Sequence, residues 1–176
     1  MKRQPDIIQA IRNKKLFGSL PEFRDLSTWF AWITWLKSLY GLPLDESELL
    51  LFQNCTGRIH PPFGEPKESA TIVGRRGGKS KMAALVGAFT AAFIDFRPYL
   101  STGERPMVLI LPRDKEQAKV VLGYLTVILQ SRRWRRRSSR RAATSWSWTT
   151  GSLFASRRWT AERSAASRSF ARFATR

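Results

Sequence analysis

A change in composition near Ser131 limits which part of this chain can fold around a core. Residues 131–176 contain 13 arginines, no lysine and a single acid, Glu162, and Leu153 is their only large aliphatic residue. Arg, Ser, Ala, Thr and Trp supply 40 of these 46 residues. A segment without aliphatic side chains buries too little apolar surface to offset the entropy lost on folding. We therefore expect residues 1–130 to contain the folded part and residues 131–176 to form a low-order tail.

Charge and composition narrow the class of protein and its partners. The 176-residue chain has a net charge of +18, of which +12 lies in residues 131–176. Such an excess favours polyanionic partners, above all nucleic acid. The single cysteine, Cys55, and the single histidine, His60, exclude an internal disulfide framework and a Cys- or His-rich metal site. No apolar run reaches the roughly 20 residues of a membrane span and no secretory signal is visible, so we expect a cytoplasmic protein without a membrane partner.

The first part of the chain has the pattern of a helical segment. Apolar residues recur at helical spacing across residues 26–40, which predicts a helix that Gly41 and Pro43 end. Asp45 followed by Glu48 is a capping-box pattern and predicts the start of a second helix. We therefore expect a helical N-terminal segment ahead of the residues described next.

The next part alternates between predicted strands and helices. After a Gly- and Pro-rich loop at 57–69, the expected elements are a buried strand at 70–73, a helix at 80–94, a strand at 107–111 and a helix from about Asp114 to Ile128. Strand, helix, strand, helix is typical of an α/β fold with a parallel sheet. We therefore divide the chain into a helical lead at 1–60, a partial α/β core at 61–130 and a tail at 131–176.

One glycine-rich motif has the residue types of a phosphate-binding loop. It lies between the strand predicted at 70–73 and the helix predicted at 80–94, which is the context such a loop requires. Glycines let consecutive backbone N–H groups surround a phosphate, and the helix N-terminus adds partial positive charge. The lysine would reach the β- and γ-phosphates of ATP, and the serine would bind Mg²⁺. The motif reads Gly74-Arg75-Arg76-Gly77-Gly78-Lys79-Ser80.

The spacing of this motif departs from the common phosphate-loop pattern. In G-x-x-x-x-G-K-[ST] the first glycine would stand at position 73, where this chain has Val73, and the glycine comes one place later at Gly74. The alternative interpretation is therefore a basic, glycine-rich turn in which Gly-Lys-Ser occurs by chance.

The motif resembles the deviant Walker A loop of phage terminase large subunits, the ATPases that package viral DNA. The resemblance covers about residues 16–130 and implies an ASCE-type P-loop NTPase fold with an incomplete parallel sheet. It also implies ATP and Mg²⁺ as cofactors, double-stranded DNA, a portal protein and a small terminase subunit as partners, and the host cytoplasm as location. Further segments that resemble this family are 23–29, 55–58, 96–100 and 112–118.

The resemblance also implies roles for single residues of the loop. Arg75 stands at the position of a proposed cis arginine finger, which would neutralise charge on the transferred phosphoryl group. Lys79 would be the catalytic phosphate-binding lysine and Ser80 the metal ligand. For Arg75 and Arg76 the alternative is ordinary solvated loop charge.

A few other residues are weaker candidates. The tryptophans at 29, 32 and 35 could form an aromatic surface near the nucleotide, although packing of their own helix explains them as well. Gln53 could contact adenine or be a plain surface glutamine. We expect Cys55 to be a small buried residue rather than a nucleophile.

The tail leaves two interpretations open. Its arginines around Trp134 could form a DNA-binding arm, or residues 131–176 could be read in the wrong frame. Moved by one base, the codons of residues 170–176 permit an apolar run ending in Asp-Glu, which a P-loop ATPase needs for hydrolysis. Without that run we expect a hydrolysis-deficient ATPase fragment. The alternatives are a small basic nucleic-acid-binding protein with a vestigial phosphate loop, or another helicase-like P-loop ATPase.

Overall fold

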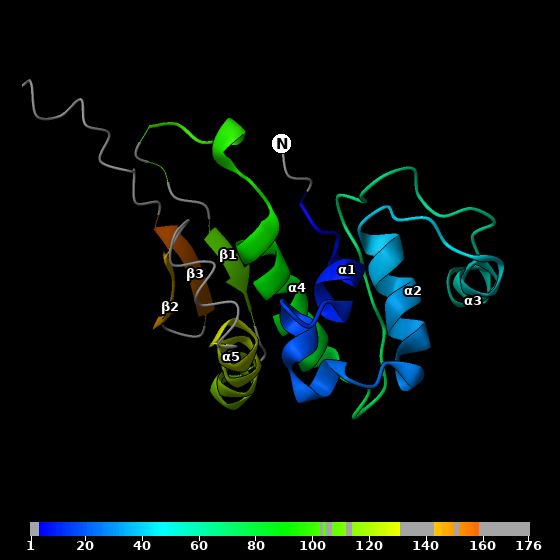
Figure 1. The fold of residues 1–176 in the computed structure, drawn as a ribbon, viewed down its shortest axis with the longest axis horizontal. Helices are drawn as coiled ribbons and strands as arrows, with labels where there is room; N and C mark the ends of the chain where they lie inside the picture. Colours follow the sequence, from blue (N-terminus) through cyan, green and yellow to red (C-terminus); the bar gives the residue numbers. More distant parts are fainter. Residues whose placement is uncertain are drawn as a thin grey trace, which may run out of the picture.

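The computed structural model describes residues 4–102, 104, 107–111, 114–130, 143–149 and 152–158, the last two ranges by their backbone. Figure 1 shows α4 between the α1 region on one side and β1 and α5 on the other, with α2 and α3 beyond α1. The helices are α1 (Ile7–Arg12), α2 (Phe30–Leu39), α3 (Glu46–Thr56), α4 (Lys79–Phe93) and α5 (Lys115–Gln130), and the strands are β1 (Met107–Ile110), β2 (Ala143–Thr149) and β3 (Ser152–Arg158). Short 3-10 turns are η1 (Phe17–Ser19), η2 (Pro21–Phe23), η3 (Ser27–Trp29) and η4 (Arg97–Tyr99).

The predicted helices form because their local signals agree with their packing. The helix expected at 26–40 is confirmed as η3 followed by α2, the one expected at 80–94 as α4, and the one expected from Asp114 as α5. At the start of α5 the Asp114 carboxylate accepts a hydrogen bond from the Gln117 amide at 2.8 Å. Such N-caps supply acceptors for amides that have no partner inside the helix.

The capping box predicted at the start of α3 is confirmed. The Glu48 amide donates to the Asp45 carboxylate at 2.9 Å, and the Asp45 amide donates to the Glu48 carboxylate at 2.9 Å. The helix ends at Gly57, whose φ of 68° is a left-handed conformation that glycine adopts without a Cβ clash.

The core lies where α1, η1, α4 and α5 meet the buried face of α2. Each large side chain that leaves water here contributes roughly 1.5–3 kcal/mol to folding. The short helix α1 supplies two of these side chains, although its few residues would not form a stable helix alone. The largest fully buried side chains are Phe17, Ile7, Ile11, Leu36, Leu85 and Leu125.

The strands form an antiparallel sheet in the order β1-β3-β2. Met107 pairs with Ser156 and Ile110 with Leu153, and β2 pairs with the other edge of β3. The sheet approaches α4 at Gly87, because a Cβ there would lie 3.1 Å from the Ile110 side chain. Glycine therefore lets the helix and β1 come close.

Two expectations about strands differ from the structure. Residues 70–73, expected as a buried strand, belong to no strand, and Ile72 is fully exposed. An extended segment becomes a strand only where a neighbour pairs with its backbone groups. The strand expected at 107–111 is confirmed as β1, but it pairs antiparallel with β3. The described residues therefore contain no parallel sheet, and the P-loop fold remains a prediction.

Two segments of the tail have a described backbone. Residues 143–149 and 152–158 form β2 and β3, whose sequences contain Thr, Trp and Phe, residue types that favour strands. The rest of the tail, including the arginines around Trp134 and residues 170–176, lies outside the described residues.

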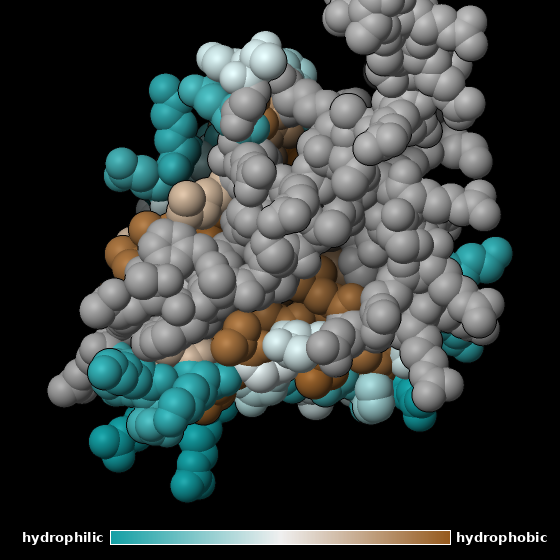
Figure 2. Space-filling view, turned by 90° about the vertical axis from the view of Figure 1, so that its left-hand side faces the viewer, coloured by the Kyte–Doolittle hydropathy of each residue, from teal (hydrophilic) through white to brown (hydrophobic). Residues whose placement is uncertain are grey.

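Several large apolar side chains of β1 and α5 are exposed. Figure 2 shows brown, apolar side chains on the side of the molecule where Figure 1 places these two elements. Every second residue of β1 points outward, so its exposed side chains share one face. The exposed apolar residues of these two elements and the residue after β1 are Met107, Leu109, Leu111, Val120 and Val127.

Candidate functional site

The loop that precedes α4 has the geometry of a helix start open to a ligand. Gly78 is the N-cap residue of this 15-residue helix and supplies no side-chain cap. The first amides of an α-helix have no acceptor inside the helix, and their aligned dipoles make this end electropositive. The N-terminus of α4 is therefore suited to an anion rather than to a cation.

The loop backbone depends on its last two glycines. The Gly77 amide donates to the Gly74 carbonyl at 3.3 Å and closes a turn. A Cβ on Gly77 would lie 2.4 Å from the Val73 side chain, and Gly78 has a φ of 87°, which side chains disfavour. Arg76 also has a positive φ, of 60°. Gly74 differs, because no atom lies within 4 Å of the position of its Cβ.

Lys79 folds back over this turn. Its ammonium group donates to the Val73 carbonyl at 3.1 Å and to the Gly74 carbonyl at 2.9 Å. The lysine is exposed, as are Arg75 and Arg76, while Ser80 is half-buried in the first turn of α4. The structure thus brings Lys79 onto the backbone of the motif and leaves the two arginines towards solvent.

Two tryptophans of α2 contact this loop across long sequence separations. The Trp32 indole N–H donates to the Gly77 carbonyl at 3.2 Å, and the Trp35 indole N–H donates to the Thr71 hydroxyl at 2.8 Å. Their rings meet edge to face, with centroids 5.3 Å apart. Trp29 instead packs edge to face against Phe23, at 5.3 Å. The sequence left two roles open for the three tryptophans, packing of their own helix or a surface near the nucleotide. In the structure Trp32 and Trp35 contact residues 71–77, whereas Trp29 packs against Phe23.

The three-residue spacing of Trp32 and Trp35 indicates from the sequence alone that both side chains contact the same part of the molecule. Residues three apart on a helix lie on the same face, so Trp32 and Trp35 must point in a similar direction. The sequence could not tell that residues 71–77 lie against that face.

The remaining sequence candidates have local roles or none. The Gln53 amide donates to the Ile59 carbonyl at 2.9 Å and so fixes the chain that leaves α3. The expectation that Cys55 is buried is wrong, because it lies exposed on the last turn of α3. His60 is exposed in the following loop.

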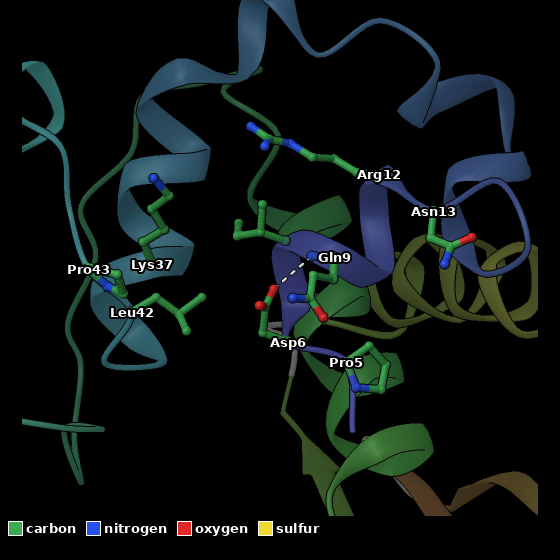
Figure 3. Close-up of a pocket in the computed structure, with 9 residues that line it drawn as sticks. Pro5, Asp6, Gln9, Arg12, Asn13, Lys37, Leu42 and Pro43 are labelled. Atoms are coloured by element: carbon green, nitrogen blue, oxygen red, sulfur yellow. Dashed lines mark hydrogen bonds between the residues drawn. The ribbon is translucent and has the colours of Figure 1, made fainter. Parts of the chain in front are cut away.

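A separate hollow of about 660 Å³ lies beside α1 (Figure 3). None of its lining residues belongs to the glycine-rich loop. Two of its charged groups have protein partners: the Asp6 carboxylate accepts from the Gln9 amide at 2.7 Å, and Lys37 lies 2.6 Å from Glu48. The hollow therefore carries less free hydrogen-bonding capacity than its size suggests.

The described residues contain no group of three or more His, Cys, Asp or Glu side chains placed to hold a metal. The role of Ser80 as an Mg²⁺ ligand stays a prediction from the sequence motif. Among the same residues, no helix is long and apolar enough to cross a membrane.

Comparison with known proteins adds no relative. No protein-family model, curated protein or solved structure matches this chain. The resemblance to terminase large subunits therefore depends on the motifs of the sequence.

Proposed function

We propose that residues 74–80 bind the phosphates of ATP together with Mg²⁺. The uncapped N-terminus of the 15-residue helix α4 supports this proposal, because its free amides and dipole favour a polyanion. The left-handed backbone at Gly78 supports it too, since such turns direct successive amides to one side.

The contact made by Lys79 carries the proposal. Its ammonium group bonds to the carbonyls of Val73 and Gly74, so a positive charge already lies over the turn. Phosphate oxygens form stronger, charge-assisted hydrogen bonds than neutral carbonyls do. A triphosphate would therefore draw Lys79 from these carbonyls without a large movement of the backbone.

The neighbouring residues would complete the site. The Ser80 hydroxyl would bind the Mg²⁺ ion, which neutralises phosphate charge when it is bound. Arg75 would approach the γ-phosphate from the solvent side. No apolar run ending in Asp-Glu follows Ser131 in the 176 residues, so we propose ATP binding, with weak or no hydrolysis, as the activity of this chain.

The family that this proposal favours is the terminase large subunit. The resemblance of the loop and its flanking segments supports a role in ATP-driven packaging of double-stranded viral DNA. The portal protein and the small terminase subunit would be the protein partners, in the cytoplasm of the host cell.

Exchange of Lys79 for alanine tests the phosphate-binding proposal. We expect Lys79→Ala to abolish binding of Mg²⁺·ATP, measured by calorimetry on the full chain. Lys81→Ala is the matched control, because Lys81 in the same turn lies 5.9 Å from the centre of the Tyr124 ring instead. Equal ATP affinity in the wild-type chain and Lys79→Ala would remove the phosphate-loop assignment.

The charge of the tail favours a second candidate function, binding of nucleic acid. Residues 131–176 carry +12 of the net charge of +18. Contacts with phosphates release counterions, so affinity for duplex DNA would fall steeply with salt. Exchange of the arginines at 132, 133, 135, 136, 137, 140 and 141 for glutamine leaves β2 and β3 in the chain and should weaken DNA binding and flatten its salt dependence. A variant with the same affinity and slope would speak against a DNA-binding tail.

A further inference from the structure

Trp32 lies where it can control the direction of a backbone amide in the glycine-rich loop. Its indole N–H donates to the Gly77 carbonyl at 3.2 Å. A Cβ on Gly78 would lie 3.5 Å from the same indole nitrogen, so the edge of the ring lies against the peptide that joins the two glycines. The three atoms nearest to that Cβ position all belong to Trp32.

Because the peptide between Gly77 and Gly78 is trans, the contact with Trp32 also sets the direction of the Gly78 N–H. The carbonyl of Gly77 and the N–H of Gly78 belong to one planar group and point to opposite sides. Because Trp32 holds the carbonyl towards α2, the Gly78 N–H points away from α2. The Gly78 carbonyl accepts from the Met82 amide at 3.0 Å, which fixes the other side of the residue in α4.

Glycines need such an external contact more than other residues do. Gly77 and Gly78 have access to a wide range of backbone angles, so the peptide between them could rotate freely without one. Trp35 adds to the restraint, because its hydrogen bond to Thr71 holds the chain that enters the loop. The edge-to-face contact of the two indoles, at 5.3 Å, stabilises both side-chain conformations.

We propose that Trp32 is a positioning residue for phosphate binding, which holds the Gly77–Gly78 peptide so that the Gly78 N–H faces the bound anion. This inference rests on the proposed function. Trp32 touches no phosphate itself and acts through the peptide. The ligand it serves is the phosphate chain of a nucleotide, rather than its base.

The first test compares phenylalanine variants of two tryptophans in the full chain, with Mg²⁺·ATP as the probe. Trp32→Phe keeps an aromatic ring but removes the N–H donor. A typical hydrogen bond is worth about 0.5–1.5 kcal/mol, so we expect about 2- to 12-fold weaker ATP binding. Trp29→Phe is the matched control, since Trp29 packs against Phe23, and its affinity should equal that of the wild type.

The outcomes separate this inference from the proposed function. If the wild-type chain does not bind Mg²⁺·ATP, the proposed function fails and this inference fails with it. If the wild type binds and Trp32→Phe binds equally well, the positioning role alone is wrong. Equal losses in Trp32→Phe and Trp29→Phe also contradict it, because they indicate a general effect on folding.

A spectroscopic measurement on the wild-type chain keeps the test independent of how the variant folds. The indole N–H resonance of Trp32 reports the hydrogen bond to Gly77 directly. We expect it to shift when Mg²⁺·ATP is added, while the Trp29 resonance stays in place. A Trp32 resonance that does not respond to saturating ATP would overturn the proposal.

Discussion

Glu48 of α3 is bonded to Lys37 of α2, with the ammonium nitrogen 2.6 Å from the carboxylate oxygen. The same carboxylate accepts from the Asp45 amide at 2.9 Å, so one buried group both closes the capping box and joins two helices. Glu48 is only 3% exposed. A buried carboxylate needs hydrogen-bond donors to be stable, and here two different donors bond to its Oε2 atom.

Glu48→Ala should therefore destabilise the fold more than the loss of a surface charge. It leaves Lys37 without its partner and removes half of the capping box, with an expected loss of about 2 kcal/mol. Urea unfolding followed by circular dichroism measures this difference. Glu46→Ala is the control, because Glu46 is exposed in the same first turn and should change stability by less than about 0.5 kcal/mol. Similar losses in both variants would contradict the dual role of Glu48.

Loss of the Trp35 hydrogen bond should loosen the chain that enters the loop. Arg75 and Arg76 are exposed, so trypsin can cleave after them when the backbone opens locally. We expect faster cleavage there in Trp35→Phe and in Thr71→Val, each of which removes one partner of the 2.8 Å bond. The double variant should be cleaved no faster than either single one. Additive rates would show that the two side chains act separately.

Alanine substitutions should separate the three glycines of the loop. Gly78→Ala forces a side chain into a φ of 87° and should cost about 1 kcal/mol or more. Gly77→Ala places a Cβ 2.4 Å from the Val73 side chain, which must move to admit it. Gly74→Ala meets no atom within 4 Å and should leave stability nearly unchanged. Thermal unfolding ranks the variants, and a Gly74→Ala as unstable as Gly78→Ala would refute this loop geometry.

The cap of α3 should weaken in acid. Hydrogen bonds from the Ser47 hydroxyl and the Glu48 amide lower the pKa of Asp45 below its ordinary value of 3.8. A lowered pKa in the folded state means that this stabilisation is present above pH 3.8 and is lost as pH falls through the folded value. Carbon NMR of the Asp45 carboxyl group measures the titration directly. Asp45→Asn, which keeps a capping oxygen without a charge, should remove this part of the pH dependence. An Asp45 that titrates above 3.8 would contradict the cap.

Local patterns predicted most of the helices because each depends on neighbours within a few residues. Asp45 and Glu48 satisfy each other three positions apart, and Asp114 reaches the amide of Gln117 at the same separation. The glycines at 77 and 78 could likewise be read as a turn before α4. The pairing of strands could not be read in this way, because apolar residues at 70–73 fit either a strand or an exposed segment until a neighbour is known.

By itself, the sequence predicted α2, α4 and α5 to within a few residues and the start of α3, and it placed a glycine-rich turn with Lys79 ahead of α4. These features follow from backbone sterics and from hydrogen bonds over three or four residues. Only the tertiary structure decided that residues 70–73 form no strand and that Trp32 holds the Gly77 carbonyl, 45 positions away. Contacts of that separation depend on how the helices pack, and helical spacing gives the face on which a tryptophan lies but not the segment it meets.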